Sequence, residues 1–150
     1  MLRKGAAEAG RQPLSAEWRV SRTIHVAASD AEAHDHVHDP RSSFQHYYAY
    51  FRQILGGLGK LVALKPRPDM PDDEVTVDGI LESRLIYGSP QTVLDKLVAF
   101  RDKAGPFGSL LFTGVDWTGP NEAWERESMR RMATEIMPRL VQHAAAKAAE

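Results

Sequence analysis

Apolar residues recur at spacings of three and four between Pro90 and Ala104, and this pattern predicts an amphipathic helix. Its apolar positions are Val93, Leu94, Leu97, Val98, Phe100 and Ala104. Ser89 suits the N-cap because its hydroxyl can accept a hydrogen bond from a free N–H in the first turn. Pro90 suits the first helical position, where its missing N–H costs little. Gly105 and Pro106 are typical of a helix end.

Short apolar runs flank this helix on both sides. Leu85–Tyr87 precedes it and predicts a short strand, and Ser109–Val115 follows it as a nearly continuous apolar run. Such a run is typical of a strand that is covered on both faces. A strand, a helix and a second strand in this order form a βαβ unit with a right-handed crossover. We therefore expect an α/β fold with parallel strands.

A second pattern, with a period of two residues, covers Trp18–Ala28. One set of alternate positions is apolar apart from Arg22, and the other set comprises Arg19, Ser21, Thr23, His25 and Ala27. This alternation predicts a strand with two different environments. In an open antiparallel sheet the polar side would face water, whereas in a (β/α)8 barrel it would point into the lumen. His25 lies near the carboxyl end of the strand, where barrel enzymes carry their chemistry, but the residues alone favour a solvent-facing or hydrogen-bonded strand histidine.

The other predicted helices are less regular. Ser29 can cap a short helix over Ala31–Val37, and Phe44–Leu55 carries an aromatic stripe typical of a core or interface helix. The last helix begins at Asn121, and we expect Pro138 to kink or end it. Its predicted apolar positions are Trp124, Met129, Met132, Ala133, Ile136 and Leu140, and its predicted exposed positions are Glu122, Glu125, Arg126, Glu127, Arg130 and Arg131.

Three segments are expected to lie outside this framework of a single domain. Residues 1–17 form a leading segment whose first ten residues resemble the tail of a helix. Residues 58–78 include a proline-rich stretch of mixed charge, and such an excursion in a compact domain suggests a lid, an insertion or a linker. Residues 141–150 form an alanine-rich tail that we expect to be frayed.

Histidines alternate with other residues at His34, His36 and His38. His34 and His38 are four residues apart and would share a helix face, which is a spacing found in metal sites. The pattern lacks the glutamate of an HExxH motif, and Pro40 ends the helix at once. A solvated polar face is therefore the favoured interpretation, and no metal site is predicted.

Composition narrows the classes of partner. The 150 residues carry a net charge of −1, with 43% hydrophobic and 26% charged residues, as is ordinary for a globular protein. This balance gives no reason to expect nucleic acid or an anionic membrane as a partner. The absence of cysteine excludes disulfides, thiolate metal sites and a cysteine nucleophile. No apolar run has the length of a membrane span or a secretory signal, so we expect a cytoplasmic location.

Four segments, in the same order along the chain, resemble the luciferase-like flavin-dependent monooxygenases. They are EWRVSRTIHVAAS from Glu17, LKPRPDMPDDEVTVD from Leu64, the stretch from Leu85 to Trp117, and SMRRMATEIMPRL from Ser128. The subgroup that they most resemble includes limonene and alkane-type monooxygenases. The GSP turn at residues 88–90 would be weak evidence by itself, but four ordered segments form a specific pattern.

The resemblance implies a (β/α)8 barrel with flavin, either FMN or a deazaflavin, bound at its carboxyl face. A full barrel needs about 250 residues, and the strands that begin near Trp18, Arg84 and Ser109 resemble the last three of its β/α units. His25 then matches a lumen histidine near the flavin or the substrate and is the candidate catalytic residue. Gly88 and Ser89 are candidate flavin contacts, Asp116 and Trp117 are candidate substrate contacts, and residues 58–78 correspond to a lid.

Two functions are weighed on this basis. The first is a flavin-dependent monooxygenase that uses reduced flavin and O2 on a small apolar substrate, with a flavin reductase as a partner, and of which this chain is the carboxyl-terminal part. The second is a non-catalytic barrel fragment that acts by pairing its exposed edges with a second copy or another chain. A weaker alternative is a small binding domain in which His34, His36 and His38 hold a metal ion.

Overall fold

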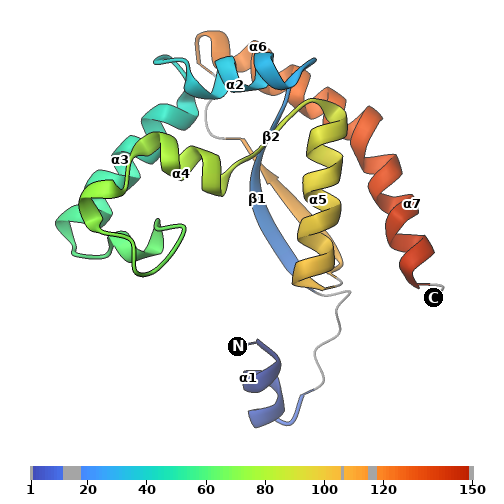
Figure 1. The fold of residues 1–150 in the computed structure, drawn as a ribbon. Helices are drawn as coiled ribbons and strands as arrows, with labels where there is room; N and C mark the ends of the chain where they lie inside the picture. Colours follow the sequence, from blue (N-terminus) through green and yellow to red (C-terminus); the bar gives the residue numbers. More distant parts are fainter. Residues whose placement is uncertain (1, 12–17, 106, 115–117, 149–150) are drawn as a thin grey trace.

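A computed structural model describes residues 2–11, 18–105, 107–114 and 118–148 (Figure 1). The strands are β1 (Arg19–Val26), β2 (Ile86–Gly88) and β3 (Ser109–Thr113). The helices are α1 (Leu2–Glu8), α2 (Asp30–His38), α3 (Ser43–Gly57), α4 (Val77–Arg84), α5 (Pro90–Ala104), α6 (Pro120–Arg131) and α7 (Met137–Ala148). Short 3₁₀ turns cover Leu61–Ala63 and Asp72–Glu74, and a π-helical turn covers Met132–Ile136. None of the described helices combines the length and the apolar character that a membrane crossing requires.

The three strands form one parallel sheet in the order β2-β1-β3. The carboxyl half of β1 pairs with β2, where Val26 lies opposite Gly88, and the amino half pairs with β3, where Arg19 lies opposite Ser109. The predicted α/β fold with parallel strands is confirmed. Because β1 lies in the centre, the connection through α5 leads from one edge of the sheet to the other.

The two faces of β1 differ in the way that the sequence predicts for a barrel strand. Ile24 and Val26 are completely buried in a cluster with residues of α5 and of the carboxyl-terminal helices. The other members of this cluster are Val93, Leu94, Leu97, Met132, Ile136 and Leu140. Figure 1 shows α5 and α7 together on this side of the strands. The apolar face of β1 therefore packs against helices, and its polar set lies on the opposite face.

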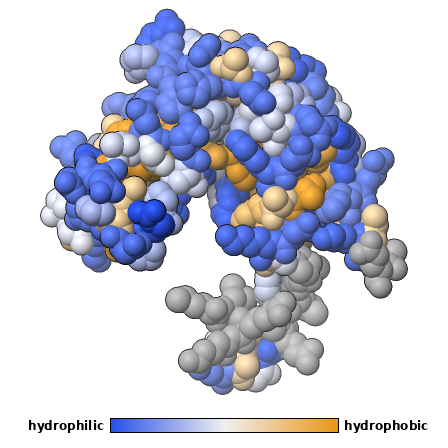
Figure 2. All heavy atoms as spheres, viewed as in Figure 1, coloured by the Kyte–Doolittle hydropathy of each residue, from blue (hydrophilic) through white to orange (hydrophobic). Residues whose placement is uncertain are grey.

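A second core cluster joins α2, α3 and α4 to the segment that links α3 with α4. Leu61, Leu64 and Val75 of this segment are buried. Lys65 forms an ion pair of 2.6 Å with Asp72, and the Arg84 guanidinium donates to the backbone carbonyl of Ala63 at 2.7 Å. In Figure 2 hydrophobic residues show in the hollow between this lobe and the α5 side, whereas the outer surface is mostly polar. Residues 58–78 thus pack against the protein through apolar contacts.

The ends of α5 confirm the predicted capping. Ser89 accepts a hydrogen bond from the backbone N–H of Thr92, and Gly105 has a φ of 86°, a conformation that favours glycine. The expectation that the strand beginning at Ser109 is covered on both faces is wrong, because Leu111 is 50% exposed. β3 lies at the edge of the sheet and packs mainly against β1. Ala104, predicted as apolar contact, is exposed as well.

The last helix differs from its predicted form. Of the two outcomes predicted for Pro138, an end of the helix is wrong, because α7 includes Pro138 and continues to Ala148, whereas a kink stays a prediction. The π-helical turn directly before Pro138 accommodates a residue that cannot donate a backbone hydrogen bond to the preceding turn. Met129 and Ala133 are exposed although they were predicted to be buried. α7 extends to Ala148, and Lys147 forms an ion pair of 2.6 Å with Asp102 of α5; fraying of residues 141–150 stays a prediction.

Candidate functional site

The polar face of β1 opens into a hollow between α3 and β3. The hydroxyl of Thr113 donates to that of Thr23 at 3.2 Å, and the hydroxyls of Thr23 and Tyr48 lie 3.5 Å apart. A cavity of about 330 Å³ is lined here by Ser21, Thr23, Tyr47, Tyr48, Thr113 and Gly114. Hydroxyl groups from three elements therefore face one small space, which suits a ligand that accepts and donates hydrogen bonds.

His25 occupies the buried end of this polar face. Its Nε2 shares a hydrogen bond of 3.1 Å with Nδ1 of His36 on α2, and its ring contacts Phe44 of α3 edge-on at 5.5 Å. Burial, with a smaller contribution from His36, lowers the pKa of His25 to about 4. The imidazole is thus neutral near pH 7. Its Nδ1 is buried and has no hydrogen-bond partner among the residues that the structure describes.

His36 connects this buried ring with the surface. Its ring stacks on Trp124 of α6 at 4.3 Å, and its Nε2 lies 3.9 Å from a carboxylate oxygen of Glu32. Burial lowers the pKa of His36 despite the opposing effect of the neighbouring carboxylates. Since the two histidines share one hydrogen bond, one ring donates and the other accepts, and each sets the tautomer of the other. The pair can therefore hold Nδ1 of His25 in a fixed protonation state toward a ligand.

The Gly88–Ser89 turn lies beside His25 at the carboxyl edge of the sheet, since His25 pairs with Tyr87 and Val26 with Gly88. Gly88 has a φ of 147°, and a Cβ there would lie 2.7 Å from a carboxylate oxygen of Asp30. That carboxylate accepts from the Ser89 N–H at 2.7 Å and from the Thr92 hydroxyl at 3.0 Å. The start of α5 thus already holds a negative group at its free N–H.

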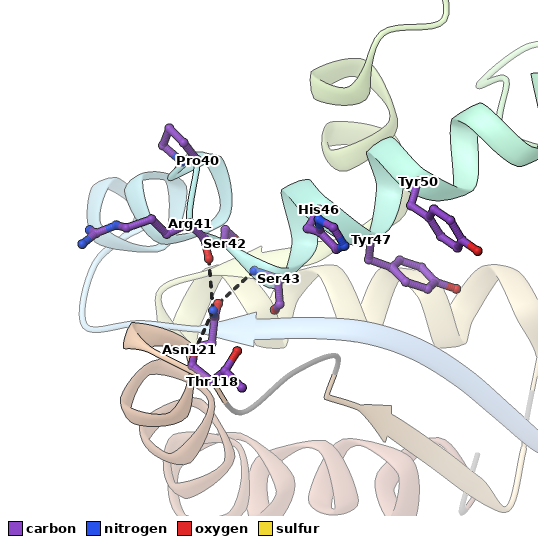
Figure 3. Close-up of a pocket in the computed structure, with 9 residues that line it drawn as sticks. All are labelled: Pro40, Arg41, Ser42, Ser43, His46, Tyr47, Tyr50, Thr118 and Asn121. Atoms are coloured by element: carbon purple, nitrogen blue, oxygen red, sulfur yellow. Dashed lines mark hydrogen bonds between the residues drawn. The ribbon is translucent and has the colours of Figure 1, made fainter.

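A second cavity, of about 440 Å³, lies where the loop before α3 meets the start of α6 (Figure 3). Asn121 closes its base, because its side-chain oxygen accepts from the Ser43 N–H at 2.9 Å and its amide donates to the Arg41 carbonyl at 3.1 Å. Tyr47 and Tyr50 of α3 form its wall and are 41% and 59% exposed. The cavity therefore combines a fixed polar base with an accessible aromatic wall.

The structure brings some of the predicted site residues together. His25, Gly88 and Ser89 lie at the same end of neighbouring strands. Asp116 and Trp117 lie outside the described residues. Sequence reasoning missed His36, Tyr48 and Asn121 as part of this region, although the aromatic stripe of α3 pointed to Tyr48 as a core residue.

Glu125 of α6 was predicted to lie on the exposed face of the last helix. This prediction is wrong, because the residue is only 1% exposed. Neither of its carboxylate oxygens has a hydrogen-bond partner in the described part of the chain. Burial raises the pKa of this carboxyl to about 7. One turn further on, the Ser128 hydroxyl accepts from the Val26 N–H at 2.9 Å and so fixes α6 to the end of β1.

Residues 1–106 match a family model described as luciferase-like monooxygenase. Limonene 1,2-monooxygenase of Rhodococcus erythropolis is 26% identical over 134 residues, which are 89% of this chain and 31% of that protein. 2,5-Diketocamphane 1,2-monooxygenase 1 of Pseudomonas putida is 27% identical over 137 residues, which are 87% of this chain and 36% of that protein. This chain spans about a third of the length of these relatives.

A solved structure shares the fold. It is the oxygenating constituent of 3,6-diketocamphane monooxygenase from the CAM plasmid of Pseudomonas putida, a type II Baeyer–Villiger monooxygenase in complex with FMN. The TM-score is 0.74 at 23% sequence identity, and the match covers 90% of this chain and 36% of that one. The fold is therefore α/β and corresponds to part of a (β/α)8 barrel.

Proposed function

The chain belongs to the luciferase-like monooxygenase family, and we propose on that premise that it contributes to a flavin-dependent monooxygenase acting on a small apolar organic substrate with reduced flavin and O2. The proposal concerns a larger assembly of barrel strands, because the chain spans about a third of its relatives. It fits relatives whose names specify monooxygenation of limonene and diketocamphane.

The observation that carries the proposal is the environment of His25. This ring is completely buried at the carboxyl end of a barrel strand, is oriented by His36, and keeps Nδ1 without a partner among the described residues. Leaving a buried polar atom unpaired costs roughly 1–3 kcal/mol. A ligand group that bonds to Nδ1 removes this cost. We assign His25 the role of donating or accepting one hydrogen bond toward the flavin or the substrate.

The residues present fit an FMN cofactor, with one condition. The cavity beside Thr23, Tyr48 and Thr113 offers hydroxyls for a polar ring system. Gly88 and Ser89 are proposed flavin contacts, and a phosphate there must displace the Asp30 carboxylate from the Ser89 N–H. Reduced flavin, when bound, supplies the electrons that activate O2. The protein's own contribution is then to bind, to exclude water and to position the substrate.

Several finer assignments belong to the same proposal. Asp116 and Trp117 contact the substrate, and Tyr47 and Tyr50 offer an apolar wall near the start of α6. Residues 58–78 act as a lid over the substrate, and Leu61, Leu64 and Val75 join this segment to the apolar cluster of α2, α3 and α4. A flavin reductase supplies the reduced cofactor, and the location is cytoplasmic.

A flavin titration tests the proposal. FMN and riboflavin are added to the chain alone, and to the chain mixed with 2,5-diketocamphane 1,2-monooxygenase 1 lacking its matched third, while flavin fluorescence and binding heat are recorded. We expect saturable FMN binding in the mixture, weakened about tenfold by His25→Gln because one hydrogen bond is lost. Asp30→Asn is expected to strengthen binding of FMN more than of riboflavin. His143→Gln, a histidine of α7 that lines neither of the two cavities, is the matched control.

Absence of flavin binding in both samples, with the chain folded, contradicts the proposal. A flavin affinity that is equal for the original chain and His25→Gln removes His25 from the site. If Asp30→Asn changes the affinities for FMN and riboflavin by the same factor, the phosphate is not at Ser89.

The second candidate function is non-catalytic association through the sheet edges. It is favoured by the outer edges of β2 and β3, which pair with no other strand among the described residues, and by Leu111, which is 50% exposed on β3. Light scattering after size-exclusion chromatography measures the mass in solution. A dimer or larger species whose mass does not change when FMN is added supports this function, whereas a stable monomer excludes it.

A further inference from the structure

The three alternating histidines of α2 point to different sides of the helix. His36 lies inward against His25 and Trp124. His34 and His38, one turn apart, stack on each other with ring centroids 4.3 Å apart and an angle of 21° between the rings. His38 contacts α4, a helix that comes about forty residues later in the chain, and a ligand atom of His34 lies within 4.8 Å of one of Glu82 on the same helix. The imidazoles of His34 and His38 therefore form a pair that is separate from the pair of His25 and His36.

Helix α4 places carboxylates against this pair. Oε1 of Glu82 lies 3.2 Å from Nε2 of His38, and Oδ1 of Asp78 lies 3.1 Å from Nδ1 of the same ring. One ligand atom each of His34, His38 and Glu82 can be chosen so that all three lie within 4.8 Å of one another. Two imidazoles and a carboxylate are a donor set that zinc takes in proteins.

We propose that His34, His38 and Glu82 bind a divalent transition-metal ion of the zinc class, with solvent completing its coordination. In a tetrahedral site with bonds of about 2.0–2.1 Å, neighbouring ligand atoms lie about 3.4 Å apart. The contact between His38 and Glu82 already has this spacing. Because the rings of His34 and His38 are stacked, the His34 ring must turn for its nitrogen to face the ion, and its side chain is 56% exposed.

The neighbouring side chains hold these ligands as the outer partners of a metal site do. Asp78 lies at Nδ1 of His38 and so leaves Nε2 for the metal, an arrangement of carboxylate, histidine and metal that recurs in zinc proteins. The Tyr87 hydroxyl donates to Glu82, and the Gln45 amide donates to Asp78 at 3.1 Å. Both carboxylates are thus held in place by side chains that donate hydrogen bonds to them.

The ligands His34, His38 and Glu82 include none of the proposed flavin contacts His25, Gly88 and Ser89. It joins α2 to α4 across a gap of forty residues in sequence, and α4 follows the packed segment 58–76. An ion held by both helices stabilises the folded chain, because an unfolded chain does not keep the three ligands together. Metal binding is therefore expected to raise the melting temperature.

Zinc titration of the full chain without an affinity tag tests the proposal. Binding heat gives the stoichiometry and Kd, and thermal melts with Zn²⁺ or with EDTA give the change in Tm. We expect one Zn²⁺ per chain and a higher Tm with Zn²⁺. His34→Ala and Glu82→Gln should each weaken binding at least about tenfold, and Asp78→Asn about tenfold through His38. His46→Gln and His143→Gln should bind Zn²⁺ like the original chain.

Melts in EDTA and far-ultraviolet circular dichroism show that the variants fold. Failure to saturate below about 1 mM Zn²⁺ overturns the site, since this Kd corresponds to only about 4 kcal/mol. Unchanged affinity in both His34→Ala and Glu82→Gln overturns it as well. So does a loss of affinity confined to His143→Gln, because His143 lies 3.7 Å from Asp102 in a separate place on α7 and α5.

Discussion

Two groups of histidines meet at helix α2 and differ in their surroundings: His36 with His25 of β1, and His34 with His38. On the inner side, His36 and His25 share a hydrogen bond among aromatic rings, and burial lowers the pKa of both. On the outer side, His34 and His38 face the carboxylates of α4, and the side chain of His34 is 56% exposed. His25 and His36 therefore orient each other, whereas both ring nitrogens of His38 lie within 3.2 Å of a carboxylate oxygen, although the side chains of His36 and His38 are equally exposed, at 18%.

The difference shows that position on the helix matters more than residue type for the chemistry of a histidine. A buried ring with an aromatic neighbour cannot easily take a proton, so it serves as a fixed hydrogen-bonding group. A ring whose nitrogens lie beside carboxylates, like that of His38, can bind a cation. If this contrast is correct, changes on the inner side alter stability strongly and with pH, whereas changes on the outer side alter it little.

The largest effect is expected for Glu125, the buried carboxyl next to Trp124. Its pKa is raised to about 7 from a usual 4.5, so the folded state keeps a proton that the unfolded state has lost. Stability therefore falls as pH rises through this window. Glu125→Gln has no such proton to lose. We therefore expect its free energy of unfolding, relative to that of the original chain, to be about 2.5 kcal/mol higher near pH 8 than near pH 5.

Urea unfolding at both pH values measures this difference. Glu122→Gln is the matched control on the same helix, because the Glu122 side chain is 54% exposed and paired with Arg126. An advantage of Glu125→Gln that stays constant with pH contradicts the burial of an uncompensated carboxyl.

A slightly smaller effect with the opposite direction is expected for His25. Its pKa is lowered to about 4 from 6.5, so the unfolded state binds a proton more readily. The stability of the neutral buried ring is present above pH 6.5 and is lost as pH falls toward 4. When the pH is lowered from about 7 to about 5, the free energy of unfolding of the original chain should fall by about 2 kcal/mol more than that of His25→Gln.

Denaturant unfolding over this range checks the expectation, with His46→Gln as a control for an exposed histidine. Equal pH dependence in His25→Gln and the original chain means that His25 takes up its proton in the folded state. The inner pair would then not differ from the outer one.

Local sequence patterns predicted much of the fold. The period of two in β1 placed Ile24 and Val26 against the helices and His25 on the opposite face, because successive strand residues point to opposite sides. The Ser89 cap and the Gly105 end of α5 depend only on neighbouring residues, and both are confirmed. The exposure of Leu111 could not be read from an apolar run, because it follows from the edge position of β3 in the sheet.

The site depends on contacts that are distant in sequence. The contact of His36 with His25 could not be predicted, because it depends on the direction in which α2 leaves the end of β1. The contact of Glu82 with His38 depends in the same way on the packing of α4. Glu125 was assigned to an exposed face because it lies among charged residues, yet the face of α6 that meets β1 carries Asn121, Glu125 and Ser128. Polar residues on a buried helix face give no periodic apolar signal.

The smallest effect is expected on the outer side, for Asp78 in the metal-free protein. Its side chain is 69% exposed, and water and salt weaken its attraction to His38. Hydrogen bonds from Gln45 and His38 lower its pKa, so its contribution is present above a usual pKa of 3.8 and is lost as pH falls below it. In EDTA near pH 7, Asp78→Asn should reduce stability by less than about 1 kcal/mol, and by less still in about 1 M NaCl.

Asp35→Asn is the matched control for Asp78→Asn, because the Asp35 side chain is 83% exposed on α2. A loss comparable to that of the inner groups, undiminished by salt, would show that the outer side is closed to solvent and that the two groups of histidines have the same kind of environment.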